Sequence, residues 1–177
     1  MTAEMISKAV QRLRKVLSRH PEAGIHADEP AVARWEQGLR VVCTHANGTR
    51  IATDLPAEIG GTGDQVTPGW LMRAGLTSCV ASRIAMGAAA EGIVLTRLEV
   101  AATSTSDARG LFGITTDLGE PITAGPRDLR LEVRISASAV PAQRLRAIID
   151  ESYRCSPVSA ALVSAVPVVL HVEIDPS

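Results

Sequence analysis

The most apolar stretch of the chain covers residues 67–91 and predicts one long central helix. Thr67 is a suitable N-cap, and Pro68 suits the first helical position because no N–H is needed there. Small or apolar residues then occupy nearly every side of the helix until Gly92, which favours a C-terminal stop. A helix that is apolar on all sides is typical of a buried element, and Cys79 lies in the middle of this one.

Three other segments have helical character. Apolar residues at helical spacing over residues 3–19, with basic residues opposite, predict a surface helix. A second helix is expected to begin at Pro141 and to run to about Arg154, and a short helical turn is expected after Pro157.

Alternating apolar and polar positions predict strands at residues 34–44, 49–55, 93–103, 129–137 and 166–174. Asn47-Gly48 predicts a hairpin turn between the first two. Cys43 shares a face with Leu39 and Val41, and is most simply a small core residue. The glycine-rich residues 56–66 are expected to form a flexible connection into the central helix.

Together these elements predict an α+β fold, in which an N-terminal β-hairpin and an antiparallel sheet pack on the long buried helix. We expect residues 1–30 to form an N-terminal helix and loop, and residues 31–177 to form a single domain.

Composition excludes several classes of function. The net charge is −1 and aromatic residues make up 2% of the chain, so neither electrostatic capture of nucleic acid nor base stacking is expected. Arg73 and Arg83 argue against a membrane span in the central helix, and the charged N-terminal segment is unlike a signal peptide, so a cytoplasmic location is expected. Three widely spaced cysteines do not form a disulfide framework, and the histidines lack metal-ligand spacing. We expect no metal and no cofactor.

Several short motifs follow one another in an order that resembles the OsmC/Ohr superfamily, the osmotically induced and organic-hydroperoxide-resistance proteins. The similarity covers roughly residues 31–174. The residues that carry it are the hairpin, Leu55-Pro56 with Gly60-Gly61, Pro68 eleven residues before Cys79, Ala89 with Gly92-Ile93, Leu98-Glu99-Val100, Ser106-Asp107-Ala108-Arg109-Gly110 with Gly113, and Ser156-Pro157-Val158.

The resemblance implies an intertwined homodimer, in which the long helices are buried between the subunits. It also implies a thiol-dependent peroxidase site at the dimer interface, where Cys79 reduces organic hydroperoxides. The candidate resolving cysteine is Cys155, and the implied reductant is an external dithiol, a lipoyl protein by family analogy.

This chemistry requires a thiolate, because a thiolate attacks one peroxide oxygen and the other oxygen leaves as an alcohol or water. Burial in an apolar helix favours the neutral thiol, so a cation is expected nearby. Arg83 lies at i+4 from Cys79 on the same helical face, and Arg34 or Arg40 of the N-terminal hairpin region could take the place of the family's arginine.

Two departures from the family pattern fall on the site. The family's peroxidases have a glutamate where this chain has Gly69, and their resolving cysteine stands where this chain has Ser156, so that Cys155 lies one position early. The alternative function is therefore a non-catalytic dimer on the same scaffold, which senses redox state or binds a small ligand.

Overall fold

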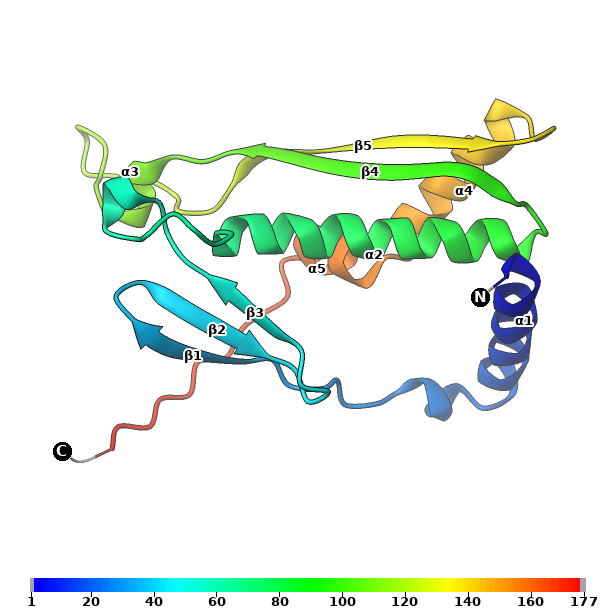
Figure 1. Cartoon of the computed structure of the whole chain (residues 1–177), viewed down its shortest axis with the longest axis horizontal. Coiled ribbons are helices and arrows are strands. Elements are labelled where there is room, and N and C mark those ends of the chain that lie inside the picture. Colours follow the sequence, from blue (N-terminus) through cyan, green and yellow to red (C-terminus); the bar gives the residue numbers. More distant parts are fainter. Residues whose placement is uncertain (1, 176–177) are drawn as a thin grey trace.

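The computed structural model describes residues 2–175, in which one long helix, α2, runs alongside a two-stranded sheet (Figure 1). The elements in chain order are α1 (Ala3–Arg19), β1 (Val32–Gln37), β2 (Arg40–Thr44), β3 (Arg50–Thr53), α2 (Pro68–Ala90), β4 (Leu95–Thr105), α3 (Ala108–Leu111), β5 (Arg127–Ala137), α4 (Ala142–Arg154) and α5 (Pro157–Ser164), with short 3₁₀ helices at Pro21–Gly24 and Ala57–Ile59. The predicted α+β class is confirmed, with two small antiparallel sheets.

The central helix α2 begins and ends where the sequence predicts. The Thr67 hydroxyl oxygen accepts a hydrogen bond from the N–H of Trp70 at 3.2 Å, and Gly92 adopts a φ of +71° just beyond the last turn. Leu76, Val80, Ile84 and Ala88 follow one another at i+4 and form a buried stripe. Within the single chain, other sides of α2 are half-buried or exposed, so its complete burial stays a prediction.

The core lies where this stripe meets the sheet of β4 and β5. The two strands are antiparallel, with Leu98 opposite Ile135 and Val100 opposite Val133. These four side chains pack against Leu76, Val80 and Ile84 of α2 and Ile148 of α4, while alternate residues of both strands face away from the core. The strands predicted at residues 93–103 and 129–137 are confirmed in type, with slightly shifted bounds.

The N-terminal sheet has three strands in the order β1-β2-β3, one more than the hairpin that we expected. The turn at Asn47-Gly48 is present, with Gly48 at φ +88°. However, the strand predicted over residues 34–44 is divided by a second tight turn at Gly38, whose φ is +55°. Since Leu39 belongs to this turn, it does not share a buried strand face: Val42 is the buried residue of β2, and Cys43 is half-buried.

The connection between β3 and α2 is ordered by a polar network, so the prediction of a flexible segment was wrong. The buried Asp54 carboxylate accepts hydrogen bonds from the Thr62 hydroxyl and from the N–H of Leu55, both at 2.7 Å. These bonds hold the pKa of Asp54 below its ordinary value. Arg40 of β2 pairs with both Asp54 and Asp64, and the connection is thereby tied to the N-terminal sheet.

Gly61 is required by the tightness of this connection. A Cβ atom at this position would lie 1.8 Å from the carbonyl oxygen of Leu55 and 2.8 Å from Oδ1 of Asp54. The first contact is with backbone, which cannot rotate away. The Gly60-Gly61 pair of the sequence motif therefore has a steric role.

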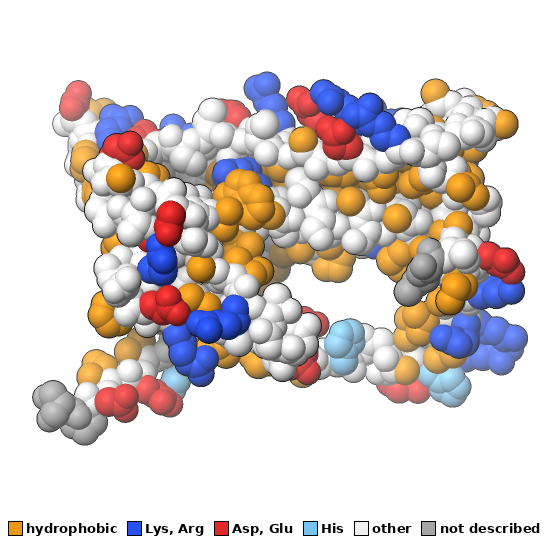
Figure 2. Space-filling view, in the orientation of Figure 1, with side chains coloured by type: hydrophobic (Ala, Val, Ile, Leu, Met, Phe, Trp, Pro, Cys, Tyr) orange, Lys and Arg blue, Asp and Glu red, His pale blue; other side chains and the backbone are white. Residues whose placement is uncertain are grey.

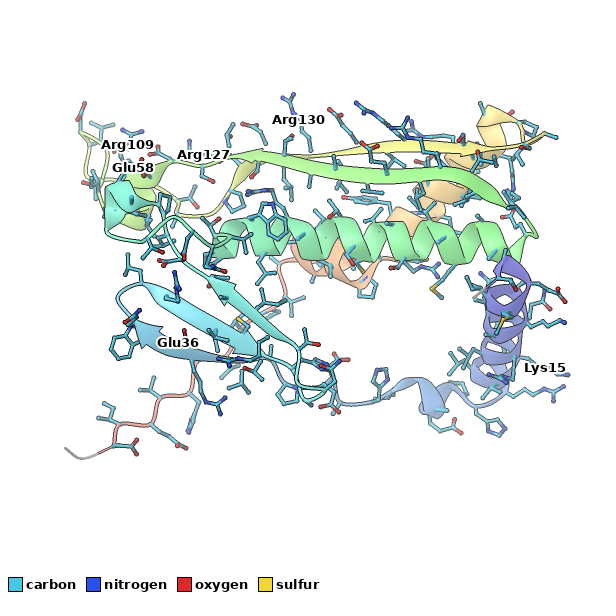
Figure 3. The ribbon with its side chains drawn as sticks, in the orientation of Figure 1. Lys15, Glu36, Glu58, Arg109, Arg127 and Arg130 are labelled. Atoms are coloured by element: carbon cyan, nitrogen blue, oxygen red, sulfur yellow. The ribbon has the colours of Figure 1, made fainter. Side chains whose placement is uncertain are left out.

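A second motif shapes the long segment between β4 and β5. Asp107 is the N-cap of α3 and accepts hydrogen bonds from the backbone and side chain of Arg109, and Arg127 lies 3.6 Å away. Figure 3 shows Arg109 and Arg127 at the same end of the molecule, beside α3. Hydrogen bonding to Arg109 lowers the pKa of Asp107 to about 2, so the carboxylate stays ionised at physiological pH.

The last strand that we predicted, at residues 166–174, does not form within this chain. The segment runs away from the body past the N-terminal sheet (Figure 1), and Val168, Val169 and Leu170 are 84–92% exposed. The alternating pattern supplies an apolar face, but a strand also needs a neighbouring edge that satisfies its backbone groups. No such edge pairs with this segment among residues 2–175.

We predict that Gly61→Ala destabilises the protein by about 1–3 kcal/mol, the usual cost of forcing extra atoms into a closely packed site. The cause is the clash with the Leu55 carbonyl. Urea unfolding followed by circular dichroism measures the effect. Gly75→Ala is the matched control, because a Cβ there meets nothing within 4 Å and alanine favours the helix. Equal midpoints for Gly61→Ala and the wild type would contradict the steric role.

Candidate functional site

Cys79 lies near the middle of α2, next to the buried stripe. Its neighbours along the helix, Leu76 and Val80, are 2% and 1% exposed, whereas Cys79 is itself half-buried. Successive residues of an α-helix are rotated by about 100°, so Cys79 is turned from the sheet-facing stripe to a neighbouring side. On that side its sulfur meets the junction of α4 and α5.

The contact at this junction is made by Ser156. Its hydroxyl donates a hydrogen bond to Sγ of Cys79 at 3.1 Å, and Ser156 is 0% exposed. The same hydroxyl oxygen is the N-cap of α5 and accepts a hydrogen bond from the N–H of Ser159 at 3.4 Å. The N-terminal N–H of α5 thus polarises the hydroxyl that points at the sulfur. A donor of this kind stabilises a thiolate more than a thiol, because hydrogen bonds to an ionised acceptor are stronger.

The other two cysteines lie elsewhere. Cys155 is exposed at the C-terminal end of α4, and Cys43 lies on β2 of the N-terminal sheet. All three cysteines are free. The structure therefore brings Ser156, and not Cys155, against Cys79. The link from α4 to α5 consists of these two residues alone, and its second residue is used to cap α5.

The three candidate cations differ in their partners. Arg40 is committed to the carboxylates of Asp54 and Asp64, and hydrogen bonding to Asp64 raises its pKa. Arg34 lies on the exposed strand β1. Arg83 is half-buried on α2, and no carboxylate of the described residues lies within 4 Å of its guanidinium. Of the three, Arg83 is the one on the same helix as Cys79 with an uncompensated charge.

Gly69, the position where the resemblance implies a glutamate, also lies beside an arginine. A Cβ atom at Gly69 would be 3.8 Å from Nη1 of Arg73, one helical turn further along α2. Arg73 instead donates a hydrogen bond to the hydroxyl of Ser104 on β4, at 3.3 Å. With glycine at position 69, the side-chain partner of Arg73 is the neutral Ser104 hydroxyl. A glutamate at position 69 would offer Arg73 a charged partner.

A cavity of about 490 Å³ opens beside the site, between α2, β5, α4 and α5. Its apolar walls come from Leu76, Val80, Leu131, Val133, Ile149 and Leu162, and Tyr153 and Ser159 contribute hydroxyl groups. The Ser159 hydroxyl is buried and has no hydrogen-bond partner. The cavity could therefore hold a small apolar molecule with one polar group.

Within residues 2–175, no group of three or more His, Cys, Asp or Glu side chains is arranged to hold a metal ion. In the same part of the chain, every helix is too short or too polar to cross a membrane.

Comparison with known proteins gives one family. The family model described as OsmC-like protein matches residues 61–171 of this chain. No curated protein matches this chain.

Solved structures have the same fold at low sequence identity. An OsmC-like protein from Mycoplasma pneumoniae is 16% identical, with a TM-score of 0.64 over 78% of this chain and 89% of that one. An organic hydroperoxide resistance protein OsmC from Legionella pneumophila is 19% identical, with a TM-score of 0.55 over 77% and 91%. An OsmC-like protein of unknown function from Vibrio cholerae is 14% identical, with a TM-score of 0.58 over 77% and 94%.

We predict that Ser156→Ala slows alkylation of Cys79 by iodoacetamide at pH 7 by about 3- to 10-fold, the equivalent of one hydrogen bond to the sulfur. The rate is measured by mass spectrometry of the peptide that contains Cys79. Ser159→Ala is the matched control, because its hydroxyl is buried three residues away and has no partner. An unchanged rate in Ser156→Ala would show that the hydroxyl does not support the thiolate.

Proposed function

The chain belongs to the OsmC-like protein family, and we propose that it is a cysteine-dependent peroxidase that reduces organic hydroperoxides with Cys79 as the nucleophile. The observation that carries this proposal is the hydrogen bond from the buried Ser156 hydroxyl to Sγ of Cys79. A half-buried thiol with a donor directed at its sulfur is suited to reaction as a thiolate. The similar fold of a protein named for organic hydroperoxide resistance favours this substrate class.

The first step is attack of the Cys79 thiolate on the terminal oxygen of the hydroperoxide. An S–O bond forms and the O–O bond breaks, so the sulfur is oxidised to a sulfenic acid. The other oxygen leaves as an alkoxide and takes up a proton to become the alcohol. Negative charge moves from sulfur to the leaving oxygen, and a nearby cation lowers the cost of this movement.

Arg83 is the cation that we assign to this task. It lies one helical turn from Cys79, where side chains at i and i+4 share a face. Its charge is not offset by a carboxylate of the described residues within 4 Å, in contrast to that of Arg40. Arg83 would act through its field on the thiolate.

The second step regenerates the thiol. A thiol condenses with the sulfenic acid, water leaves, and a disulfide forms; a second thiol then reduces this disulfide. We propose an external dithiol as the reductant, with a lipoyl group as one candidate. Cys155 is the candidate resolving residue within the chain, although Ser156 occupies the position against Cys79 in this structure. Resolution by Cys155 would require the link between α4 and α5 to rearrange.

We further propose that the chain acts as an intertwined homodimer. Within a single chain, Trp70 of α2, Leu13 of α1 and the residues from Val166 to Ile174 leave large apolar areas exposed. Figure 2 shows an open space bounded by α1, the segment after it and the N-terminal sheet. A second subunit would cover these areas and would offer a strand edge to residues 166–174, in agreement with their alternating pattern.

The 490 Å³ cavity favours one alternative function, a dimer that binds a small ligand or senses redox state without turnover. Gly69 and Ser156, where the family's peroxidases have a glutamate and a cysteine, point the same way. On this alternative, Cys79 would be oxidised once and would not be recycled.

We predict that the purified protein consumes cumene hydroperoxide in the presence of dihydrolipoamide, and that Cys79→Ser reduces the rate to that measured without protein. The reason is that serine offers no ionised nucleophile at neutral pH. Peroxide is followed by the ferrous xylenol orange assay. Equal rates in the wild type and Cys79→Ser, or no turnover in the wild type, would reject the peroxidase in favour of the binding alternative.

Cys155→Ser separates the two routes of resolution in the same assay. If an external thiol resolves the sulfenic acid, Cys155→Ser turns over like the wild type, and one equivalent of peroxide without reductant leaves a sulfenic acid on Cys79 of the wild type with Cys155 free. If Cys155 resolves it, mass spectrometry finds a Cys79–Cys155 disulfide in the wild type, and the variant is over-oxidised. Cys43→Ser is the control for a cysteine far along the chain from the site.

We predict a solution mass of twice the chain mass of 18.6 kDa, because the exposed apolar areas need a partner. Light scattering after size-exclusion chromatography at micromolar concentration measures it. Deletion of residues 166–177 should weaken the dimer, whereas removal of a segment without alternating apolar residues should not. A stable monomer of the full chain would contradict the assembly.

A further inference from the structure

A second, polar cavity of about 260 Å³ lies between three helices, on a different part of α2 from the apolar one. Arg14 of α1, Arg83 of α2 and Arg144 of α4 line it, together with Glu91, Glu151 and Ser152. The helices place these residues together for a simple reason. The half-buried residues Ala3, Ile6 and Val10 of α1 form one face at i+3 and i+4 spacing, and Arg14 continues that face by one more turn.

The charges in this cavity are not balanced. Arg144 forms a two-pronged ion pair with Glu91, and hydrogen bonding to that carboxylate raises the pKa of Arg144. Glu151 also acts on Arg144. Arg14 and Arg83, in contrast, have no carboxylate within 4 Å among the described residues. The lining therefore has three guanidinium groups and two carboxylates, and two of these guanidinium groups form no ion pair.

A buried donor in the wall gives independent support. The Nε–H of Arg83 is shielded from solvent and has no hydrogen-bond partner in the described part of the chain. A buried N–H of a charged group that lacks an acceptor is costly, so such groups are nearly always satisfied in native proteins. The wall also contains Ser152, a 2%-exposed residue with a second donor.

We propose that this cavity is a binding site for a small oxyanion, a phosphate or carboxylate group held by Arg14 and Arg83 with Ser152. Guanidinium groups suit this ligand because their paired N–H donors match the spacing of carboxylate and phosphate oxygens. The volume admits an inorganic anion or a compact metabolite and is too small for most drug-sized ligands. Neutralisation of Arg14 and Arg83 would also fasten α1 to α2 and α4.

Because Arg83 also takes part in the proposed peroxidase reaction, binding is measured by stability and not by turnover. The probes are sodium phosphate and sodium succinate, each compared with sodium chloride at equal ionic strength, on the full-length wild-type protein. An anion that binds the folded state raises the midpoint of thermal unfolding, and the stabilisation grows with the logarithm of one plus the ratio of anion concentration to Kd. We expect phosphate, succinate or both to raise it above chloride, and the stronger of the two identifies the ligand class.

Arg14→Gln is the decisive variant, because Arg14 lies on the exposed helix α1 and takes no part in the proposed reaction. We expect Arg14→Gln to raise the Kd of the anion by about tenfold or more, the equivalent of a lost hydrogen bond to a charged group. The Kd is obtained from the dependence of the unfolding midpoint on anion concentration. Arg12→Gln is the matched control, with the same change of charge on the same helix outside the cavity. Arg83→Gln should weaken binding similarly, with circular dichroism as a check of folding.

Two results would overturn the proposal. One is a shift no larger than that of chloride for both probes in the wild type. The other is an anion effect that Arg14→Gln and Arg12→Gln retain equally, because the effect would then come from general exclusion of the anion from the protein surface.

Discussion

The packing of one stripe of α2 against the two-stranded sheet fixes the position of every other feature of the site. Leu76, Val80 and Ile84 are 0–2% exposed and contact both strands and α4, so the rotation of α2 about its axis is determined. Because the helix cannot turn, Cys79 must face the junction of α4 and α5, and Arg83 must face the cavity beside α1. A rigid helix thus presents Cys79 and a cationic cavity on adjacent turns.

Much of the fold could be predicted because it is decided locally. Helix caps, the i+4 stripe and the alternation in β4 and β5 depend on residues a few positions apart, and each was located from the sequence. The turn at Gly38, which divides one predicted strand, is a local feature that the alternating pattern did not indicate. The other errors lie where distant residues decide the structure. The connection after β3 is ordered by Arg40, which lies 14 residues before Asp54, and residues 166–174 have the pattern of a strand without a neighbour. Composition alone describes neither situation.

The candidate site could be predicted only in part. The position of Cys79 on the long helix and the replacement of the family's cysteine by Ser156 are visible in the sequence, but the contact between them joins residues 77 positions apart. Arginine partners are equally hidden: Arg34, Arg40 and Arg83 were all candidates from the sequence, and only the folded chain shows that Arg40 is held by two carboxylates. The cavity between α1, α2 and α4 could not be predicted from the sequence, because its three arginines come from separate helices.

The replacement of a cysteine by serine at position 156 has a specific chemical consequence. A hydroxyl can donate a hydrogen bond to the sulfur of Cys79 as a thiol would, yet it cannot form a disulfide with it. Cys155 could approach Cys79 only if the two-residue link turned, and this movement would withdraw Ser156 from the N-terminus of α5, where caps contribute about 1 kcal/mol. The link between α4 and α5 therefore cannot do both at once: in one conformation Ser156 supports the Cys79 thiolate, and in another Cys155 would resolve the sulfenic acid. In the reaction that we propose, a thiol from outside the chain would resolve the sulfenic acid without disturbing the cap, and the position of Ser156 favours that route.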